Sequence, residues 1–270
     1  MQYRVDLHTH STASDGQYTP SQVVHMARQA GIQILALTDH DTLSGLDEAA
    51  QTAREIGLFF IKGAELAARE HRNLHLLAYH FQDSPTPLSR LCEQLQQGRR
   101  ERSARILDYL RERGVPLTPE EVHGPGRPHF AQALVARHYV QNTREAFDKY
   151  LDTPEFSSIE RPKPTAQACI EAIKGAGGYA AFAHPYQLQY DEESLEKLVI
   201  HLKFCGLDAI ECYYPRHTPA QTALYLSLAR KYDLRVTAGS DFHGERVKPD
   251  VHLTPWPLEL PDLQLPDGPL

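Results

Sequence analysis

The sequence lacks several features that would assign it to other classes of protein. No apolar run approaches the roughly 18 to 20 residues that span a bilayer, and the first residues form a polar strand where a signal peptide would have an apolar core. The four cysteines, Cys92, Cys169, Cys205 and Cys212, include no C-x-x-C pair, so neither a disulfide framework nor a cysteine metal site is indicated. These absences predict a cytoplasmic protein without a membrane partner, whose cysteines are small buried residues.

The chain also lacks the basic excess of proteins that bind nucleic acids along the phosphate backbone. Its formal net charge of −7 predicts no stable binding of duplex nucleic acid, although local basic pockets are compatible with it. Motifs of covalent catalysis are missing as well, because there is no G-x-S-x-G, no P-loop and no cysteine beside a histidine. The composition is ordinary for a globular protein, and 270 residues suit either two average domains or one α/β barrel.

What the sequence has in abundance is histidine, with fifteen residues. A predicted strand over residues 3–7 places His8 and His10 two positions apart, on one face at its end, which is the geometry of a metal clamp. A His-x-His pair by itself is as often two ordinary surface histidines as it is a pair of metal ligands. Three later β-rich segments also end in His, Asp or Glu: Thr38-Asp39-His40, Ala183-His184-Pro185 and Gly239-Ser240-Asp241-Phe242-His243.

The hydrophobic periodicity predicts an α/β framework with a helical insertion. Apolar runs of strand length occur at 34–38, 58–65, 179–183, 209–213 and 235–240, and a polar hairpin at 69–73 leads into a strand at 74–79. Helices are predicted at 20–30, 46–56, 88–113, 131–139, 143–150, 165–173, 194–204 and 219–232. The framework is therefore assigned to residues 1–84 and 159–250 and the insertion to 85–158. No regular structure is predicted after Gly244, including the Pro-rich tail 251–270.

The strand ends collect the candidate metal ligands. In parallel α/β barrels the C-terminal ends of the strands converge on one axis, so these side chains are expected to meet there. Nine such groups are too many for one ion, and gathering them without cations would require charge neutralisation, so two or three divalent metals are predicted. The nine candidates are His8, His10, Asp15, His40, Glu65, His75, His184, Asp241 and His243.

These motifs resemble those of the polymerase and histidinol phosphatase (PHP) family of metal-dependent phosphoesterases. The residues that carry the likeness are Asp6-Leu7-His8-Thr9-His10 with Asp15, Thr38-Asp39-His40-Asp41, Gly63-Ala64-Glu65, His75, Ala183-His184-Pro185 and Gly239-Ser240-Asp241-Phe242-His243. The resemblance implies an α/β fold, a distorted seven-stranded (β/α) barrel. It also implies one metal held by His8, His10, Glu65 and Asp241, a second by Glu65, His75 and His184, and a third by Asp15, His40 and His243.

The same resemblance implies the chemistry. Paired metals lower the pKa of a bridging water and clamp the phosphate oxygens during in-line displacement, and the implied catalytic residues are His8, His10, Glu65, Asp241 and His243. Asp15 stands where many relatives have a histidine, which favours manganese over zinc, with iron also compatible. Asp39 is expected to orient a ligand rather than to bind metal.

The substrate prediction rests on the insertion. Gly126-Arg127-Pro128-His129-Phe130 resembles a stretch of the PHP subfamily that acts on nucleoside 3′,5′-bisphosphates and on 5′-phosphorylated short RNAs. Arginine can grip a phosphate bidentately, so Arg127 and His129 are predicted to bind a substrate phosphate, with a capped loop as their alternative role. Arg216 and His217, after the strand at 209–213, are further substrate-binding candidates.

Three functions stay open at this point. The first is a phosphohydrolase, expected to be monomeric, that acts on a phosphorylated nucleotide or short RNA. The second is a histidinol-phosphate phosphatase, favoured if Arg127 and His129 are remote from the metals. The third is a non-catalytic accessory module, as in some DNA polymerases, against which the intact ligand set speaks.

Overall fold

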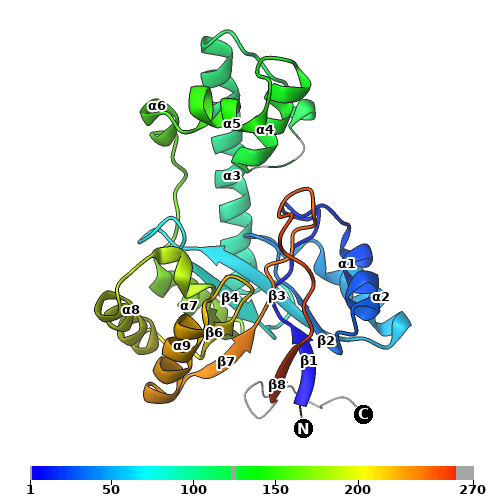
Figure 1. Cartoon of the computed structure of the whole chain (residues 1–270), viewed down its shortest axis with the longest axis vertical. Coiled ribbons are helices and arrows are strands. Elements are labelled where there is room, and N and C mark those ends of the chain that lie inside the picture. Colours follow the sequence, from blue (N-terminus) through cyan, green and yellow to red (C-terminus); the bar gives the residue numbers. More distant parts are fainter. Residues whose placement is uncertain (1, 123, 125, 260–270) are drawn as a thin grey trace. The chain divides into compact units, whose positions relative to one another are not determined.

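The chain forms two compact units in the computed structural model, which describes residues 2–122, 124 and 126–259 (Figure 1). Residues 1–92 and 163–270 make up the first unit, and residues 93–162 make up the second. Among the described residues, no helix combines the length and the apolar character needed to cross a bilayer.

The first unit is built on one sheet with the strand order β7-β6-β5-β4-β3-β2-β1-β8. The strands are β1 (Gln2–Asp6), β2 (Ile34–Leu37), β3 (Phe59–Ala67), β4 (His75–Tyr79), β5 (Tyr179–Phe182), β6 (Ala209–Tyr213), β7 (Arg235–Ala238) and β8 (Trp256–Glu259). Neighbours pair in parallel except that β4 is antiparallel to β3 and β5, and β8 is antiparallel to β1. The Leu7 N–H donates to the Ala238 carbonyl and the His10 N–H to the Phe242 carbonyl, both at 2.9 Å. These bonds nearly close the sheet, and the predicted α/β barrel is confirmed.

The eighth strand corrects the prediction that no regular structure follows Gly244. In β8, Trp256 lies opposite Val5 and Glu259 opposite Gln2. Pro257 has no N–H to donate to a neighbouring strand. Among the described residues β8 pairs with β1 alone, and an edge strand of this kind tolerates proline. A four-residue strand that contains proline shows no readable periodicity, which explains why the sequence did not reveal it.

In the described part of the first unit, the 3-10 helix η3 (Pro185–Leu188) follows β5, and five α-helices flank the strands. They are α1 (Pro20–Gln29), α2 (Leu46–Ile56), α7 (Ala166–Gly175), α8 (Glu192–Phe204) and α9 (Pro219–Lys231). Local capping explains their starts, because Thr19, Thr165 and Thr218 each accept a hydrogen bond from the backbone N–H three residues later. Figure 1 shows α1 and α2 side by side near β1 and β2, and α7, α8 and α9 on the side of β6 and β7.

The interior of the barrel is apolar below the strand ends. Alternate residues of the strands face inward, among them Val5 and Leu7 of the β1 segment and Ala209 of β6. The Tyr79 hydroxyl, also inside, donates to the Leu7 carbonyl at 2.8 Å. Glu211 has the same alternation as Ala209, so a carboxylate enters the interior at the level where the apolar core ends.

The second unit is helical and has its own core. Its elements are the greater part of α3 (Pro87–Glu112), η1 (Pro119–Glu121), α4 (Arg127–Ala136), α5 (Thr143–Ala146), the π-helical turn η2 (Phe147–Leu151) and α6 (Pro154–Ser157). Leu110, Phe130, Leu134 and Phe156 are buried together at its centre. The helix predicted at 131–139 begins earlier, at Arg127, because Pro128 suits the first turn of a helix.

Candidate metal centre

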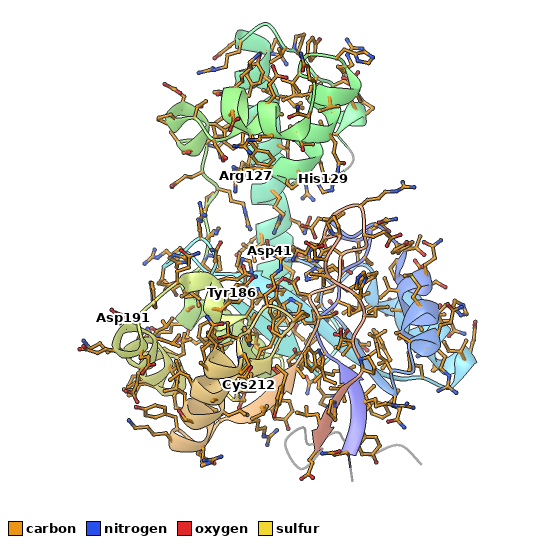
Figure 2. The ribbon with its side chains drawn as sticks, in the orientation of Figure 1. Asp41, Arg127, His129, Tyr186, Asp191 and Cys212 are labelled. Atoms are coloured by element: carbon orange, nitrogen blue, oxygen red, sulfur yellow. The ribbon has the colours of Figure 1, made fainter. Side chains whose placement is uncertain are left out.

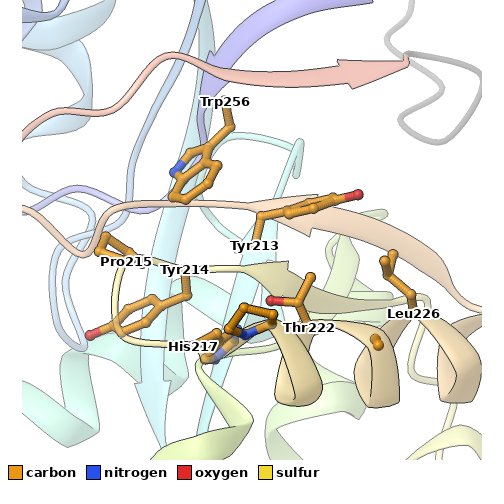
Figure 3. Close-up of a pocket in the computed structure, with 9 residues that line it drawn as sticks. Tyr213, Tyr214, Pro215, His217, Thr222, Leu226 and Trp256 are labelled. Carbon is orange, nitrogen blue, oxygen red and sulfur yellow. The ribbon is translucent and has the colours of Figure 1, made fainter.

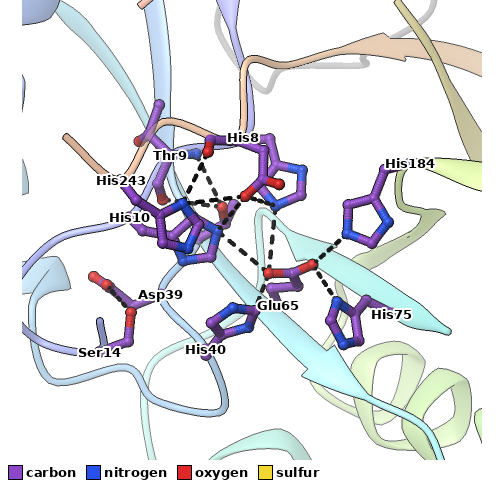
Figure 4. A network of polar contacts seen from close by, with 12 residues as sticks. His8, Thr9, His10, Ser14, Asp39, His40, Glu65, His75, His184 and His243 are labelled. Atoms are coloured by element: carbon purple, nitrogen blue, oxygen red, sulfur yellow. Dashed lines mark hydrogen bonds and ion pairs between the residues drawn. The ribbon is translucent and has the colours of Figure 1, made fainter. Parts of the chain in front are cut away.

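The structure brings all nine predicted ligands into one cluster at the strand ends of the first unit (Figure 4). His8 and His10 follow β1, His40 follows β2, and Glu65 lies within β3. His75 opens β4, His184 follows β5, and both Asp241 and His243 follow β7. Asp15, His40 and His75 are partly exposed, and the other six are buried.

Glu65 occupies the centre of the cluster. Its Oε2 lies 2.9 Å from His40 Nδ1, 3.3 Å from His10 Nε2 and 3.4 Å from His8 Nε2. Its Oε1 lies 2.7 Å from His75 Nδ1 and 2.9 Å from His184 Nε2. Burial opposes ionisation, but the surrounding imidazoles outweigh it and hold the pKa of Glu65 well below its usual value. The carboxylate is therefore ionised at neutral pH, with imidazole nitrogens around both of its oxygens.

Two further carboxylates complete the anionic part of the site. Asp241 Oδ1 lies 3.3 Å from both His10 Nε2 and His243 Nδ1. Asp15 Oδ1 lies 3.3 Å from His243 Nε2, and its Oδ2 lies 3.8 Å from His40 Nε2. Burial raises the pKa of each, but His40 and the other neighbouring histidines hold the pKa of Asp15, and Lys248 and His8 that of Asp241, well below the usual value. Three ionised carboxylates thus lie among six imidazoles.

The histidines differ in their readiness to bind metal. Burial lowers the pKa of His75 to about 4 and also lowers that of His243, so both are neutral at pH 7, the form that ligates metal. Burial acts in the same direction on His8, but the carboxylates of Glu211, Glu65 and Asp241 outweigh it and raise the pKa of His8 well above 6.5. His8 must therefore lose a proton before its Nε2 can ligate a cation.

Sequence reasoning missed Glu211, which orients His8 from behind. Glu211 is buried, and its Oε1 accepts a hydrogen bond from His8 Nδ1 at 3.0 Å, which directs His8 Nε2 toward the cluster. Its Oε2 accepts from the His184 backbone N–H at 2.7 Å. The sequence did contain a signal for Glu211, which is a lone carboxylate within an otherwise apolar strand. Because a buried charge needs a partner, such a residue is expected to contact a polar or charged group.

An unusual backbone conformation sets the direction of two of the predicted ligands. His184 and Asp241 have φ angles of 29° and 59°, in the left-handed region that non-glycine residues seldom adopt. Such positions cost roughly 1–3 kcal/mol each and concentrate at functional sites. Gly239 has a different role: a Cβ there would lie 2.2 Å from His8 Cβ and 2.7 Å from Glu211 Oε1. Only glycine allows this pair to pack against the end of β7.

Two aspartates near the cluster organise the chain around it. Asp39 accepts hydrogen bonds from the Ser11 N–H at 2.8 Å and from the Ser14 hydroxyl at 2.5 Å, and so holds the loop that carries Asp15. This contact accords with the expected orienting role. Asp6 accepts from the backbone N–H groups of Ser240 at 2.9 Å and Thr254 at 3.1 Å, and burial raises its pKa to about 7.

The donor atoms form three groups that could each hold a metal ion. The groups are His8, His10, Glu65 and Asp241; His10, Asp15, His40 and His243; and His40, Glu65 and His75. Among the described residues, His8 Nε2, both ring nitrogens of His10, and Glu65 Oε2 are buried without a hydrogen-bond partner, as expected of atoms reserved for a cation. The predicted set of Glu65, His75 and His184 meets at Glu65 Oε1, which lies 2.7 Å from His75 Nδ1 and 2.9 Å from His184 Nε2, and His40 joins Glu65 and His75 in the third group.

The predicted substrate residues lie in both units. Arg127 and His129 belong to the second unit (Figure 2), where Arg127 pairs with Asp152 at 2.7 Å and His129 Nδ1 accepts from the Gly126 N–H at 3.3 Å. Both contacts match the capped-loop alternative. Arg216 is exposed in the first unit, after β6.

His217 lies next to Arg216 but makes a structural contact. Its Nδ1 donates to the Cys212 carbonyl at 3.0 Å. Its ring helps to line a cavity of about 410 Å³ together with Tyr213, Tyr214 and Trp256 (Figure 3).

Known proteins share this fold and its motifs. The family description of the PHP domain matches residues 6–153. A 5′-3′ exoribonuclease of Haemophilus influenzae is 34% identical over 252 residues, covering 90% of this chain and 91% of that protein. The chain belongs to the PHP family.

Other relatives of this PHP chain carry names of the same reaction class. A phosphoribosyl 1,2-cyclic phosphate 1,2-diphosphodiesterase of Eggerthella lenta is 32% identical over 89% of this chain and 94% of its own. A 3′,5′-nucleoside bisphosphate phosphatase of Chromobacterium violaceum is 30% identical over 89% of this chain and 87% of its own. A Bifidobacterium adolescentis structure described as a metal-dependent phosphoesterase aligns with a TM-score of 0.77 at 33% identity, covering 89% of this chain and 87% of that one. The predicted family and hydrolase class are confirmed.

Proposed function

We propose that this PHP protein is a metal-dependent phosphohydrolase that acts on nucleoside 3′,5′-bisphosphates and on 5′-phosphorylated short RNA. The observation that carries the proposal is the cluster in which Glu65 contacts five imidazoles beside Asp15 and Asp241. Two relatives at 30% identity or more, named for these two activities, support the choice of substrate.

The cofactors of the proposal are two or three divalent metal ions, manganese first, with zinc or iron as alternatives. Imidazole nitrogens and carboxylate oxygens are the donors that these metals accept. Asp15 supports manganese because it adds a hard oxygen donor to the group with His10, His40 and His243. Glu65, His10 and His40 each belong to two of the groups, and the two carboxylate oxygens of Glu65 would allow it to hold two ions.

In the proposed mechanism, residues of the chain would hold the metal ions, orient the ligands and balance the charges within the site. When bound, divalent metals supply the Lewis acidity that generates hydroxide near neutral pH and offsets the charge of the phosphate. Glu65 in β3 and Asp241 after β7 would help to hold the ions, while Glu211 fixes the tautomer of His8. The burial of His8, His10 and His243 limits access of bulk water to the centre. Arg216 is proposed to grip a non-reacting phosphate of the substrate, and Arg127, His129 and His217 remain predictions for the same task.

A second candidate substrate is a cyclic phosphodiester of a phosphorylated sugar. The relative from Eggerthella lenta, 32% identical over most of the chain, favours it. The ligand cluster suits either ester, because in-line displacement assisted by paired metals is used both by phosphatases, which act on monoesters, and by nucleases, which act on diesters. Histidinol phosphate, the alternative from the sequence, belongs in the same test.

One substrate panel tests the proposal. The purified protein is stripped of metal, loaded in parallel with manganese, zinc or iron, and assayed with adenosine 3′,5′-bisphosphate, a short 5′-phosphorylated RNA, a cyclic phosphoribosyl phosphate and histidinol phosphate. We expect the highest kcat/KM with manganese on the bisphosphate or the RNA. Preference for histidinol phosphate, or turnover of none of the four, would refute the proposal. A monomer in solution and a cytoplasmic location stay predictions.

A further inference from the structure

The two oxygens of Asp241 have different surroundings. Oδ1 faces the imidazoles, 3.3 Å from His10 Nε2 and from His243 Nδ1. Oδ2 faces away and accepts two hydrogen bonds, from the Tyr214 hydroxyl at 2.9 Å and from the Lys248 ammonium at 2.6 Å. Asp241 is 2% exposed, so these contacts are made where water competes little. One oxygen is left for the cluster and the other is occupied.

The Tyr214 hydroxyl is held in a fixed direction. Tyr214 is buried, and its ring packs against those of His184, Tyr186 and His217. Gln187 Nε2 donates to the same hydroxyl at 3.4 Å, so the oxygen accepts one bond and donates the other to Asp241. The aromatic packing therefore presents a donor to Oδ2 before any ligand binds.

Lys248 reaches Oδ2 from an anchored turn. Its backbone N–H donates to the Gly244 carbonyl at 2.8 Å. The turn is tied to the loop after Asp15, because Gln17 N–H donates to the His243 carbonyl at 2.7 Å and Gln17 Oε1 accepts from the Arg246 N–H at 2.9 Å. Gly244 has a φ of 90° and would place a Cβ 2.5 Å from Gln17 Cβ, so the close approach requires glycine. The backbone that carries Lys248 is therefore held in place by these contacts.

From this arrangement we propose that Tyr214 and Lys248 are positioning residues that make Asp241 a ligand through Oδ1 alone. The inference rests on the proposed metal site and adds to it two residues outside the ligand set. A carboxylate without these donors can rotate or offer both oxygens to one cation. The ammonium also offsets the negative charge on Oδ2, which stabilises Asp241 in its ionised form in a buried position.

The test uses metal binding rather than turnover. Tyr214→Phe removes one donor and keeps the ring, and Lys248→Met removes the other and keeps most of the stem. Tyr213→Phe and Arg246→Met are the matched controls, since they are neighbours that make no side-chain contact with Asp241 among the described residues. Each metal-free variant is first checked by thermal melting and then titrated with Mn²⁺ by calorimetry and with Co²⁺ by visible absorption.

We expect Mn²⁺ affinity to fall about 10- to 100-fold in Tyr214→Phe and Lys248→Met, the usual effect of losing a group that orients a ligand. Co²⁺ absorption should weaken as Asp241 adds its second oxygen and the coordination number rises, while both controls bind as the unaltered protein does. Lys248→Arg, which keeps a cationic donor, should recover part of the loss. Unchanged Mn²⁺ affinity and Co²⁺ spectrum in both variants, or equal losses in the controls, would overturn the proposal. Because no substrate is present, failure of the proposed phosphohydrolase would leave this result standing on its own.

Discussion

At the scale of residues, the clustering of the candidate ligands followed from their positions in the sequence, whereas the residues that contact them from outside the cluster could not be predicted. His8, His10 and Asp241 stand within a few residues of the ends of predicted strands, so sequence position alone places them at one end of the barrel. Glu211 reaches His8 across 203 positions, and Lys248 meets Asp241 through a turn whose shape depends on Gln17. Such contacts depend on the tertiary fold, which periodicity does not describe.

Glu211→Gln tests the carboxylate behind His8. The amide keeps the shape of Glu211 but removes the charge, so metal affinity should fall about 10- to 100-fold, with a parallel loss in kcat. Calorimetric titration with Mn²⁺ and steady-state kinetics measure the two effects. Glu171→Gln, an exposed substitution on α7, serves as the control. Unchanged affinity in Glu211→Gln would remove Glu211 from the site.

Proton release tests the state of His8. Its pKa is raised well above 6.5 in the metal-free protein, so His8 is protonated at pH 7 and must lose that proton on metal binding. Metal affinity should therefore increase with pH until the pKa of His8 is passed. Calorimetry in buffers of different ionisation enthalpy counts the protons, and fewer should be released by Glu211→Gln because one carboxylate that raises the pKa is gone. Equal release in both proteins would contradict this account of His8.

At the scale of elements, the strands and the longer helices followed from hydrophobic periodicity, and the short ones did not. α2 occupies 46–56 as predicted, and α9 differs by one residue, because a cap or a glycine marks each end. β8 and α6 are four residues each and gave no pattern, and the helix predicted at 143–150 is divided between α5 and the π-helical turn η2. Their positions depend on neighbours that only the fold supplies.

Leu258→Ala tests the contribution of β8 to the barrel. Leu258 is 4% exposed and belongs to the core of the barrel, so its truncation should lower the free energy of unfolding by about 2–4 kcal/mol. Glu259→Ala, the exposed neighbour on the same strand, should change it little. Denaturant unfolding of both variants measures the difference. Equal stability of the two would mean that β8 pairs without contributing to the core.

At the scale of the whole molecule, the chain combines a barrel that carries the ligands with a helical unit that carries Arg127 and His129. The motifs identified the family, since the PHP relatives cover about nine-tenths of the chain. Substrate selection was less predictable, because Arg127 pairs with Asp152 and the cap of α4 accounts for His129. A residue with a structural contact can still bind phosphate, and only kinetics separates the two roles.

The substitution Arg127→Ala separates a role of Arg127 in binding phosphate from a purely structural role. If Arg127 binds a second phosphate, KM for adenosine 3′,5′-bisphosphate should increase at least about tenfold while KM for a simple aryl phosphate stays constant. Arg144→Ala, an exposed arginine of the same unit, is the control. Equal effects on the two substrates would assign Arg127 to the stability of the helical unit.

The central claim is that the histidine and carboxylate cluster holds the metals that hydrolyse phosphate esters. The most direct measurement compares bound manganese, by elemental analysis, and hydrolysis of adenosine 3′,5′-bisphosphate in the unaltered protein, His8→Ala and Asp241→Asn. We predict that the unaltered protein binds two or three ions and turns over the substrate. Both variants should bind fewer ions and lose activity while they keep the fold. A His8→Ala protein with full metal content and full activity would contradict the account.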